Sequence, residues 1–397
     1  MPLILNGVSL LLGRELDYVE RGHLVVDDGK IISAGEGSFA GKGKSMDGRG
    51  FLVMPGFINA HTHIADSVGK DIASGQGLDA RVHPAFSAKK KILELTGQEH
   101  LKNFIRISAI SMMKKGIVAF ADFREGGPQG IRLLKEAIAG LPIKCVALGR
   151  TGHVGTLENK SGLSAESASE AAKVLEIANG LGISGANEHS DSALLHYREL
   201  AKGALVAIHA AESAETVSFS RERTGKSEVE RIMANLKPDF LVHMTNATDD
   251  DIALAATSRT GIVVCPRANG VLGAGIPKVA KMLKAGCTVA VGTDNVMLNS
   301  PDISRELDYI WKASRATEGE MIAPREILKM ATSNAAEILR LNSGWIEPGR
   351  AADLLFVDKH HADLYPMHDP HAALVHRLGE KGIASVMIDG RFVGPTN

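Results

Sequence analysis

The sequence predicts an α/β protein: a central parallel sheet with short antiparallel strands before and after it. Three observations predict this fold class. Short, nearly continuous apolar segments recur through the middle of the chain, amphipathic segments separate them, and shorter strands broken by Gly, Asn and Asp lie at both ends. Apolar runs of the first kind are typical of parallel strands that are buried on both faces.

The middle of the chain alternates predicted strands with predicted helices. We expect strands over residues 51–59, 116–123, 143–149, 182–185, 205–209, 240–243, 261–265 and 287–292. We expect helices over residues 97–115, 167–180, 276–285 and 324–340. The second helix is expected to begin with a capping box formed by Ser167 and Glu170. Eight strands alternating with helices is the count of a (β/α)8 barrel, but a doubly wound parallel sheet gives the same alternation.

The two ends of the chain have a different sequence pattern from the middle. Short apolar pieces separated by turn residues lie at 3–5, 8–12, 23–26, 30–34, 353–357, 386–388 and 391–393. Such spacing indicates short antiparallel strands. We therefore expect the two β-rich ends to pair into one small domain built from both termini.

Composition excludes several classes of protein. The chain has 397 residues with 45 Lys and Arg against 46 Asp and Glu, which argues against binding nucleic acid or an acidic membrane through bulk charge. No apolar run approaches the roughly 18 residues that a membrane-spanning helix needs, and the N-terminus lacks the features of a signal peptide. Three scattered cysteines are too few for a disulfide framework. We expect a cytoplasmic protein whose partner is a small-molecule substrate.

Histidine and acidic residues follow the predicted strands. His61 and His63 end the first strand two positions apart, so both side chains point to the same face. His209, His243 and Asp294 end the fifth, sixth and eighth strands. Each residue alone is equally well a polar group at the start of a loop. Together they indicate a site for a divalent metal such as Zn or Fe(II), because imidazole and carboxylate are its usual ligands.

These segments resemble the amidohydrolase superfamily, in the branch of cytosine deaminase, guanine deaminase and triazine hydrolases. The resemblance covers nearly the whole chain and is carried by residues 55–63, 208–213, 265–269, 291–294 and 346–354. It implies a (β/α)8 TIM barrel with a small β-sandwich domain formed from both termini. The metal-binding barrel would span residues 55–345, and residues 1–54 with 346–397 would form the composite sandwich.

The resemblance also implies the roles of the site residues. One divalent metal ion, zinc with Fe(II) as the alternative, would be held by His61, His63, His209 and Asp294. Glu212 would shuttle protons, and His243 would contact the metal-bound hydroxide or the substrate. The fourth strand does not end in the lysine that bridges two metals in binuclear relatives, so a single metal is expected. Relatives are often oligomers, so we expect a homo-oligomer.

The implied function is metal-dependent deamination of a heterocyclic substrate such as a nucleobase, nucleoside or pterin, by attack of metal-bound hydroxide on a C–N bond. A hydrolase of a cyclic amide, or of a chloro- or alkylamino-substituted ring, would use the same site. A catalytically inactive binding paralogue is the third alternative, although such relatives lose ligands that this chain retains.

Five further residues that follow strands are candidates for substrate contact: Arg124, Arg150, His153, Arg267 and Asn269. An arginine could bind a substrate carboxylate or phosphate through bidentate hydrogen bonds, or could form a salt bridge at the rim of the barrel. Asn269 could contact a ring edge or shape its own turn. Residues 64–71 differ from the corresponding loop of the branch, which argues against assigning a particular nucleobase.

Overall fold

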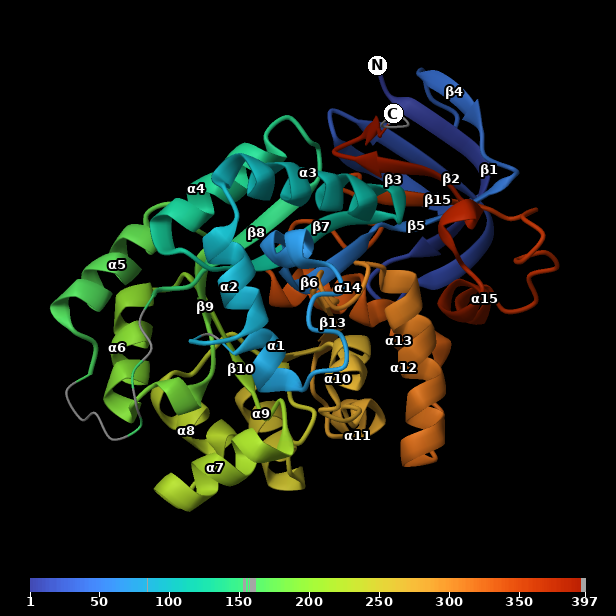
Figure 1. Cartoon of the computed structure of the whole chain (residues 1–397). Helices are drawn as coiled ribbons and strands as arrows, with labels where there is room; N and C mark the ends of the chain where they lie inside the picture. Colours follow the sequence, from blue (N-terminus) through green and yellow to red (C-terminus); the bar gives the residue numbers. More distant parts are fainter. Residues whose placement is uncertain (84, 153–154, 156, 158–161, 394–397) are drawn as a thin grey trace.

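The computed structural model describes residues 1–83, 85–152, 155, 157 and 162–393 (Figure 1). Within these residues the strands form two sheets, one of nine strands and one of eight. Helices surround the first sheet, and both ends of the chain lie in the second.

The nine-stranded sheet is parallel throughout and confirms the predicted α/β class. Its order is β13-β12-β11-β10-β9-β8-β7-β6-β14. In chain order, the strands are β6 (Phe57–His63), β7 (Ile117–Arg124), β8 (Lys144–Gly149), β9 (Gly180–Ile183), β10 (Leu205–Ala210), β11 (Phe240–His243), β12 (Gly261–Val264), β13 (Val289–Val291) and β14 (Asp294–Asn295). The strands are mostly buried, as expected for a sheet covered on both faces.

The sheet curls so that its two edges approach each other, in a manner consistent with a TIM-like barrel. β13 pairs with β12 at one edge, β14 pairs with β6 at the other, and only residues 292–293 separate β13 from β14. Gly292 is required for this closure, because a Cβ atom there would lie 2.6 Å from the Cβ of His61 and 2.7 Å from its backbone nitrogen. The prediction of one continuous eighth strand over 287–292 is therefore wrong in extent.

The first predicted strand, 51–59, is also divided. β5 (Phe51–Pro55) belongs to the eight-stranded sheet, and β6 begins at Phe57 in the nine-stranded sheet. The chain crosses between the sheets at Gly56, whose N–H donates to the carbonyl oxygen of Asp353 at 2.9 Å. Hydrophobic periodicity could not show this crossing, because both halves are equally apolar.

Helices connect the parallel strands and cover the outside of the sheet (Figure 1). They are α3 (Gln98–Lys114), α4 (Gly127–Ile138), α5 (Ala165–Leu175), α6 (Asp191–Ala201), α7 (Ala214–Thr224), α8 (Glu228–Asn235), α9 (Asp249–Ser258), α10 (Pro266–Leu272), α11 (Val279–Lys284), α12 (Ile303–Glu318), α13 (Pro324–Met330) and α14 (Ser333–Ile338). The predicted capping box at Ser167 is wrong: Ser164 is the N-cap, and its side chain accepts the N–H of Ser167. The predicted helix 324–340 is two helices, α13 and α14.

The eight-stranded sheet joins the two ends of the chain. Its order is β17-β16-β15-β5-β1-β2-β3, with β4 also paired to β1. Besides β5, the strands are β1 (Leu3–Leu12), β2 (Asp17–Asp27), β3 (Lys30–Glu36), β4 (Lys44–Asp47), β15 (Leu354–Asp358), β16 (Ile383–Ile388) and β17 (Arg391–Phe392). β5 pairs antiparallel with β15, which brings the two ends together, and a separate apolar cluster forms the core of this sheet.

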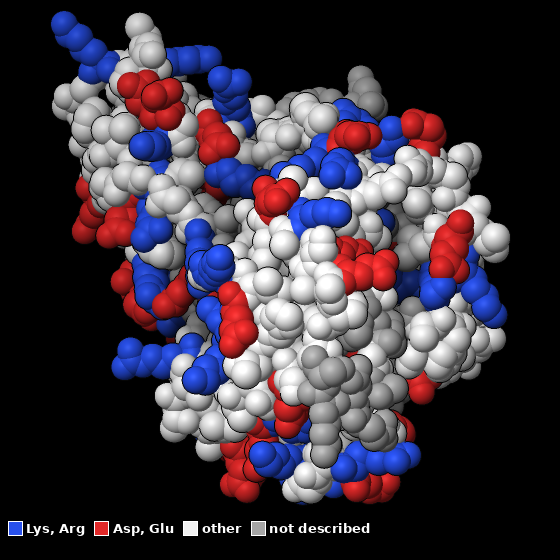
Figure 2. Space-filling model, turned by 90° about the vertical axis from the view of Figure 1, so that its left-hand side faces the viewer, with Lys and Arg blue, Asp and Glu red and all other residues white. Residues whose placement is uncertain are grey.

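Shorter elements complete the chain. They are η1 (Ile64–Gly69), α1 (Leu78–Val82), α2 (Ala88–Leu95), η2 (Ala186–Glu188), α15 (Pro370–His376) and η3 (Glu380–Gly382). Over the described part of the chain, no helix has the length and apolar character needed to cross a membrane. On the face drawn in Figure 2, Lys and Arg are interspersed with Asp and Glu, in keeping with the near-zero net charge.

Candidate metal centre

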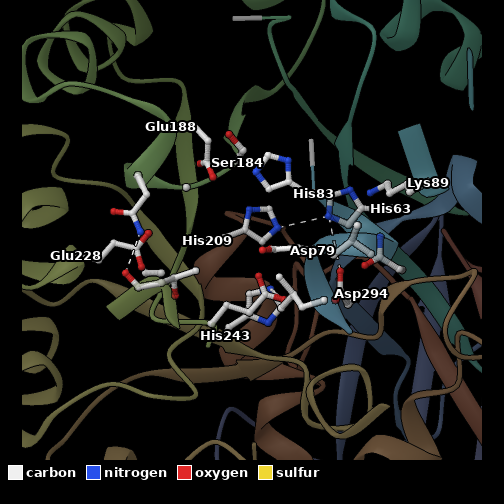
Figure 3. Close-up of a pocket in the computed structure, with 18 of the residues that line it drawn as sticks. His63, Asp79, His83, Lys89, Ser184, Glu188, His209, Glu228, His243 and Asp294 are labelled. Atoms are coloured by element: carbon white, nitrogen blue, oxygen red, sulfur yellow. Dashed lines mark hydrogen bonds and ion pairs between the residues drawn. The ribbon is translucent and has the colours of Figure 1, made fainter. Parts of the chain in front are cut away.

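The side chains predicted as metal ligands gather at the carboxyl ends of the parallel strands, and Figure 3 shows three of them, His63, His209 and Asp294. Ligand atoms of His61, His63 and His209 lie within 4.8 Å of one another, and so do those of His61, His243 and Asp294. Asp294 Oδ1 lies 3.3 Å from His61 Nε2 and 3.7 Å from His63 Nε2. The Nε2 atoms of His63 and His209 are 3.4 Å apart. Residues far apart in the sequence thus form one compact cluster.

Two of the imidazoles are oriented through their Nδ1 atoms. His63 Nδ1 lies 2.9 Å from Glu125 Oε1 and 3.1 Å from the carbonyl oxygen of Phe123. His209 Nδ1 lies 3.0 Å from the carbonyl oxygen of Ile183. Because these partners accept hydrogen bonds, the tautomer that fits both rings carries its proton on Nδ1 and turns the lone pair of Nε2 to the cluster. This is the arrangement of metal-ligating histidines.

His61 supplies the test of whether a metal fits. Both of its ring nitrogens are buried and have no hydrogen-bond partner, although buried polar atoms are almost always paired. Burial lowers the pKa of His61 to about 3 and, together with the neighbouring imidazoles, holds the pKa of His209 well below its usual value. Both rings are therefore neutral, as ligands must be. Three imidazoles and one carboxylate fit a divalent ion such as zinc.

The backbone is strained where the strands deliver two of these side chains. His243 has φ of 75° and Asp294 has φ of 60°, in the left-handed region that non-glycine residues rarely adopt. Burial opposes ionisation of Asp294, but the contact with His61 Nε2 at 3.3 Å and the surrounding imidazoles lower its pKa below the ordinary value. Strain of this kind is concentrated at functional sites, and an ionised Asp294 is available as a ligand.

Glu212 and His243 lie beside the cluster. Glu212 Oε1 is 3.6 Å from His243 Nε2. Asn269 Nδ2 donates to His243 Nδ1 at 3.0 Å, so the ring proton is on Nε2, which faces Glu212. Burial and the charge of Asp294 raise the pKa of Glu212. A carboxyl group that holds its proton more tightly than usual is suited to general acid–base chemistry.

The cluster opens into a small pocket of about 90 Å³. Charged groups contribute to its wall: Asp79, Lys89, Arg150, Glu188, Glu212, Glu228 and Asp294. A second cavity, of about 850 Å³, shares Asp79, His83 and Glu188 with the first. The small pocket and the larger cavity therefore adjoin, with these side chains between them.

The predicted substrate contacts are not all brought to this pocket. Arg150 lines it. Arg124 is buried behind it, with Nε donating to the carbonyl oxygen of Gly130 at 3.3 Å. Arg267 pairs with the buried Glu306 at 3.3 Å and is not among the residues of the pocket wall, so the salt-bridge alternative describes it.

Asn269 contacts His243 rather than the pocket, and its buried Oδ1 has no hydrogen-bond partner. Its place is that of a residue that orients a catalytic candidate. His153 lies outside the described residues.

Sequence reasoning missed several residues of the site, among them Glu125 and Lys89. Glu125 immediately follows β7, the same position that singled out the other candidates, so this signal was available. Lys89 lies on α2, 5% exposed, with Nζ 2.6 Å from Glu125 Oε1. No motif marks Lys89 in the sequence, because its role depends on how α2 docks.

Comparison with protein families gives a match between residues 52–393 and the model of the amidohydrolase family. A Methanothermobacter thermautotrophicus protein, provisionally named an aminohydrolase, is 38% identical over 394 residues, which are 98% of this chain and 99% of that protein. The 5-methylthioadenosine/S-adenosylhomocysteine deaminase of Halobacterium salinarum is 29% identical over 395 residues, 94% of this chain and 89% of the relative.

Among solved structures, an adenosine deaminase from Xanthomonas campestris with bound zinc is similar in fold. Its TM-score is 0.82 at 20% sequence identity, and the match covers 98% of this chain and 92% of that chain. The likeness extends over both sheets of the present structure.

Proposed function

The chain belongs to the amidohydrolase family, and from this premise we propose that it is a zinc-dependent hydrolase that deaminates a heterocyclic substrate. The substrate class is a nucleobase, nucleoside or pterin-like ring that carries an amino group. One metal ion would be held by His61, His63, His209 and Asp294. The names of the deaminase relatives support the reaction, and the zinc of the adenosine deaminase structure supports the metal.

The observation that carries the proposal is the pair of unpartnered ring nitrogens of His61 inside a cluster of three imidazoles and one carboxylate. A divalent ion held there would lower the pKa of a bound water to about 7, which would supply a nucleophile at neutral pH. The carboxylate of Asp294, 3.3 Å from His61 Nε2, is placed to accept a proton from that water.

The chain's own side chains supply the remaining proton transfers. Glu212, whose pKa is raised, would deliver its proton to the ring nitrogen next to the reacting carbon. The proton that Asp294 accepts from the water would pass to the departing amine as the C–N bond breaks, and the second proton of the water would return to Glu212. His243 Nε2, protonated because Asn269 donates to Nδ1, donates a hydrogen bond to the oxygen that adds to the carbon. Such a donor stabilises the charge that develops there.

The same premise extends to the domains. We infer that the curled sheet is a closed (β/α)8 barrel over residues 55–345, and that residues 1–54 with 346–397 form a separate β-sandwich domain. The separate apolar core of the eight-stranded sheet supports the second domain.

The experiment is an ammonia-release screen of the zinc-loaded protein against purines, pyrimidines, pterins, deoxyadenosine-type nucleosides and triazines. The proposal expects release from at least one ring substrate and its loss on zinc removal. With that substrate, Glu212→Gln should lower turnover by about 10² to 10⁴ while zinc content stays at one equivalent. Turnover of cyclic amides with failure of every amino-substituted ring would contradict deamination and favour the cyclic-amide hydrolase.

A further inference from the structure

Two short helices, α1 and α2, contribute to the wall of the metal pocket from outside the nine-stranded sheet (Figures 1 and 3). α2 begins after Ser87, whose Oγ accepts the N–H of Lys90. This cap sets the direction of the first turn, so that Lys89 is buried while the neighbouring Lys90 pairs with Glu94 at the surface. Of these two adjacent lysines on one helix, Lys89 is thus buried and Lys90 lies at the surface.

Lys89 reaches the contact that orients a candidate ligand. Its Nζ lies 2.6 Å from Glu125 Oε1, and the same oxygen lies 2.9 Å from His63 Nδ1. Asp66 Oδ2 is a more distant neighbour of Nζ, at 3.8 Å. One carboxylate oxygen therefore forms an ion pair with Lys89 of α2 and a hydrogen bond with the imidazole of His63.

Lys89 differs from the other cations around Glu125. Arg124 and Arg150 lie 3.5 Å and 3.8 Å from its carboxylate, and both follow strands of the nine-stranded sheet. Among the described residues, Lys89 is the nearest cation and the one cation of this group that belongs to α1 or α2. Undocking α2 would leave Glu125 with its two weaker partners.

We propose that Lys89 is a positioning residue that couples the docking of α2 to metal binding through Glu125 and His63. This inference rests on the proposed function only in that a metal binds His63 Nε2. Partners of a ligating imidazole strengthen and orient it, and losing one costs roughly 10- to 100-fold in metal affinity. The coupling is reciprocal, so bound metal must stabilise docked α2 by the same factor.

The first measurement is zinc affinity of the full-length protein, by competition with a chromophoric chelator and without substrate. Lys89→Met should weaken zinc binding roughly 10- to 100-fold. Lys89→Arg, which keeps the charge, should restore most of it. Lys90→Met is the matched control, one position along the same helix, and should bind zinc like the wild type. Unchanged zinc affinity in Lys89→Met, or an equal loss in Lys90→Met, would overturn the proposal.

The second measurement is amide hydrogen exchange with and without zinc. The wild type should show zinc-dependent slowing of exchange in α2, and α9, which contributes no residue to the pocket wall, is the reference. Lys89→Met should lose this slowing, whereas a purely structural lysine would change exchange equally in both states. If the variant does not fold, the wild-type protein alone tests the coupling. The coupling is overturned if zinc slows amide exchange in α2 no more than in α9.

Zinc affinity and amide exchange test the role of Lys89 separately from the proposed deamination. A lysine that binds substrate instead would raise KM in Lys89→Met without changing zinc affinity, and that result would also overturn it. Failure of every ring substrate would contradict the deaminase proposal and leave both zinc measurements valid.

Discussion

The two sides of the candidate metal centre support their imidazoles in different ways. On the β6–β7 side, His63 contacts the carbonyl oxygen of Phe123 and, in addition, the carboxylate of Glu125, which is itself surrounded by cations. On the β9–β10 side, His209 contacts a backbone carbonyl oxygen alone, that of Ile183. The orientation of His63 therefore depends in part on a side chain that can be changed, and that of His209 on the position of a strand.

The buried carboxylates of the two sides differ correspondingly. Burial opposes ionisation of Glu125, but the charge of Lys89 and the hydrogen bond with His63 outweigh burial and hold its pKa well below the usual value. Burial raises the pKa of Glu228 to about 8, and the nearby carboxylates of Glu188 and Glu212 add to the rise. Neighbouring charges, and not burial alone, thus decide the state of an acid here.

The largest expected effect comes from the carboxylate of the proposed ligand set. Asp294→Asn removes the carboxylate that contacts His61 and His63. The variant should lose bound zinc and lower kcat/KM by about 10³ or more, because metal chemistry contributes several kcal/mol to the barrier. Elemental analysis and steady-state kinetics on a substrate from the screen check this. A zinc-loaded, active variant would remove Asp294 from the ligand set.

The next effect tests whether the sides differ as described. Glu125→Gln keeps an oxygen to accept the His63 hydrogen bond but leaves Lys89 and its neighbours without a counter-charge. Zinc affinity should fall roughly 10- to 100-fold, measured by chelator competition. Glu188→Gln, a carboxylate change on the opposite side, is the control and should bind zinc within about threefold of the wild type. Equal losses of zinc affinity in the two variants would mean that Glu125 supports metal binding no more than Glu188 does.

The position of each site residue relative to its strand determines whether it could be predicted from the sequence. His61, His209 and Asp294 were found because each follows an apolar strand, and parallel strands bring their carboxyl ends to one edge. The same rule selected Arg267, which the structure pairs with Glu306 away from the pocket. Position at a strand end places a residue on the correct edge but does not fix the direction of a long side chain.

The remaining features depend on tertiary contacts that leave no local pattern. Lys89 acts through the docking of α2, and Asn269 acts through the ring of His243. The division of the predicted strand at Gly56 arises because two sheets meet there. Apolar periodicity is the same on both sides of such a crossing, so it predicts burial without predicting the sheet to which a residue belongs.

The smallest expected effect concerns stability on the β9–β10 side. Glu228 has a folded-state pKa of about 8, above the roughly 4.3 of an unfolded glutamate. Between these values the folded state binds more protons than the unfolded state, so stability falls as pH rises from about 4 to 8 and levels off above. Urea unfolding of the zinc-free protein at pH 5 and pH 8 should show a loss of at least about 1 kcal/mol from this group.

Glu228→Gln should flatten this dependence, because the amide does not titrate. The amide retains an acceptor for only one of the backbone N–H groups of Ala186 and Ala211, so stability should fall at pH 5 more than at pH 8. Glu199→Gln, at an exposed position of α6, should leave the difference between the two pH values unchanged. If Glu228→Gln retains the full wild-type pH dependence, the carboxyl of Glu228 is ionised in the folded protein. Glu228 and Glu125 would then differ in their contacts but not in their charge.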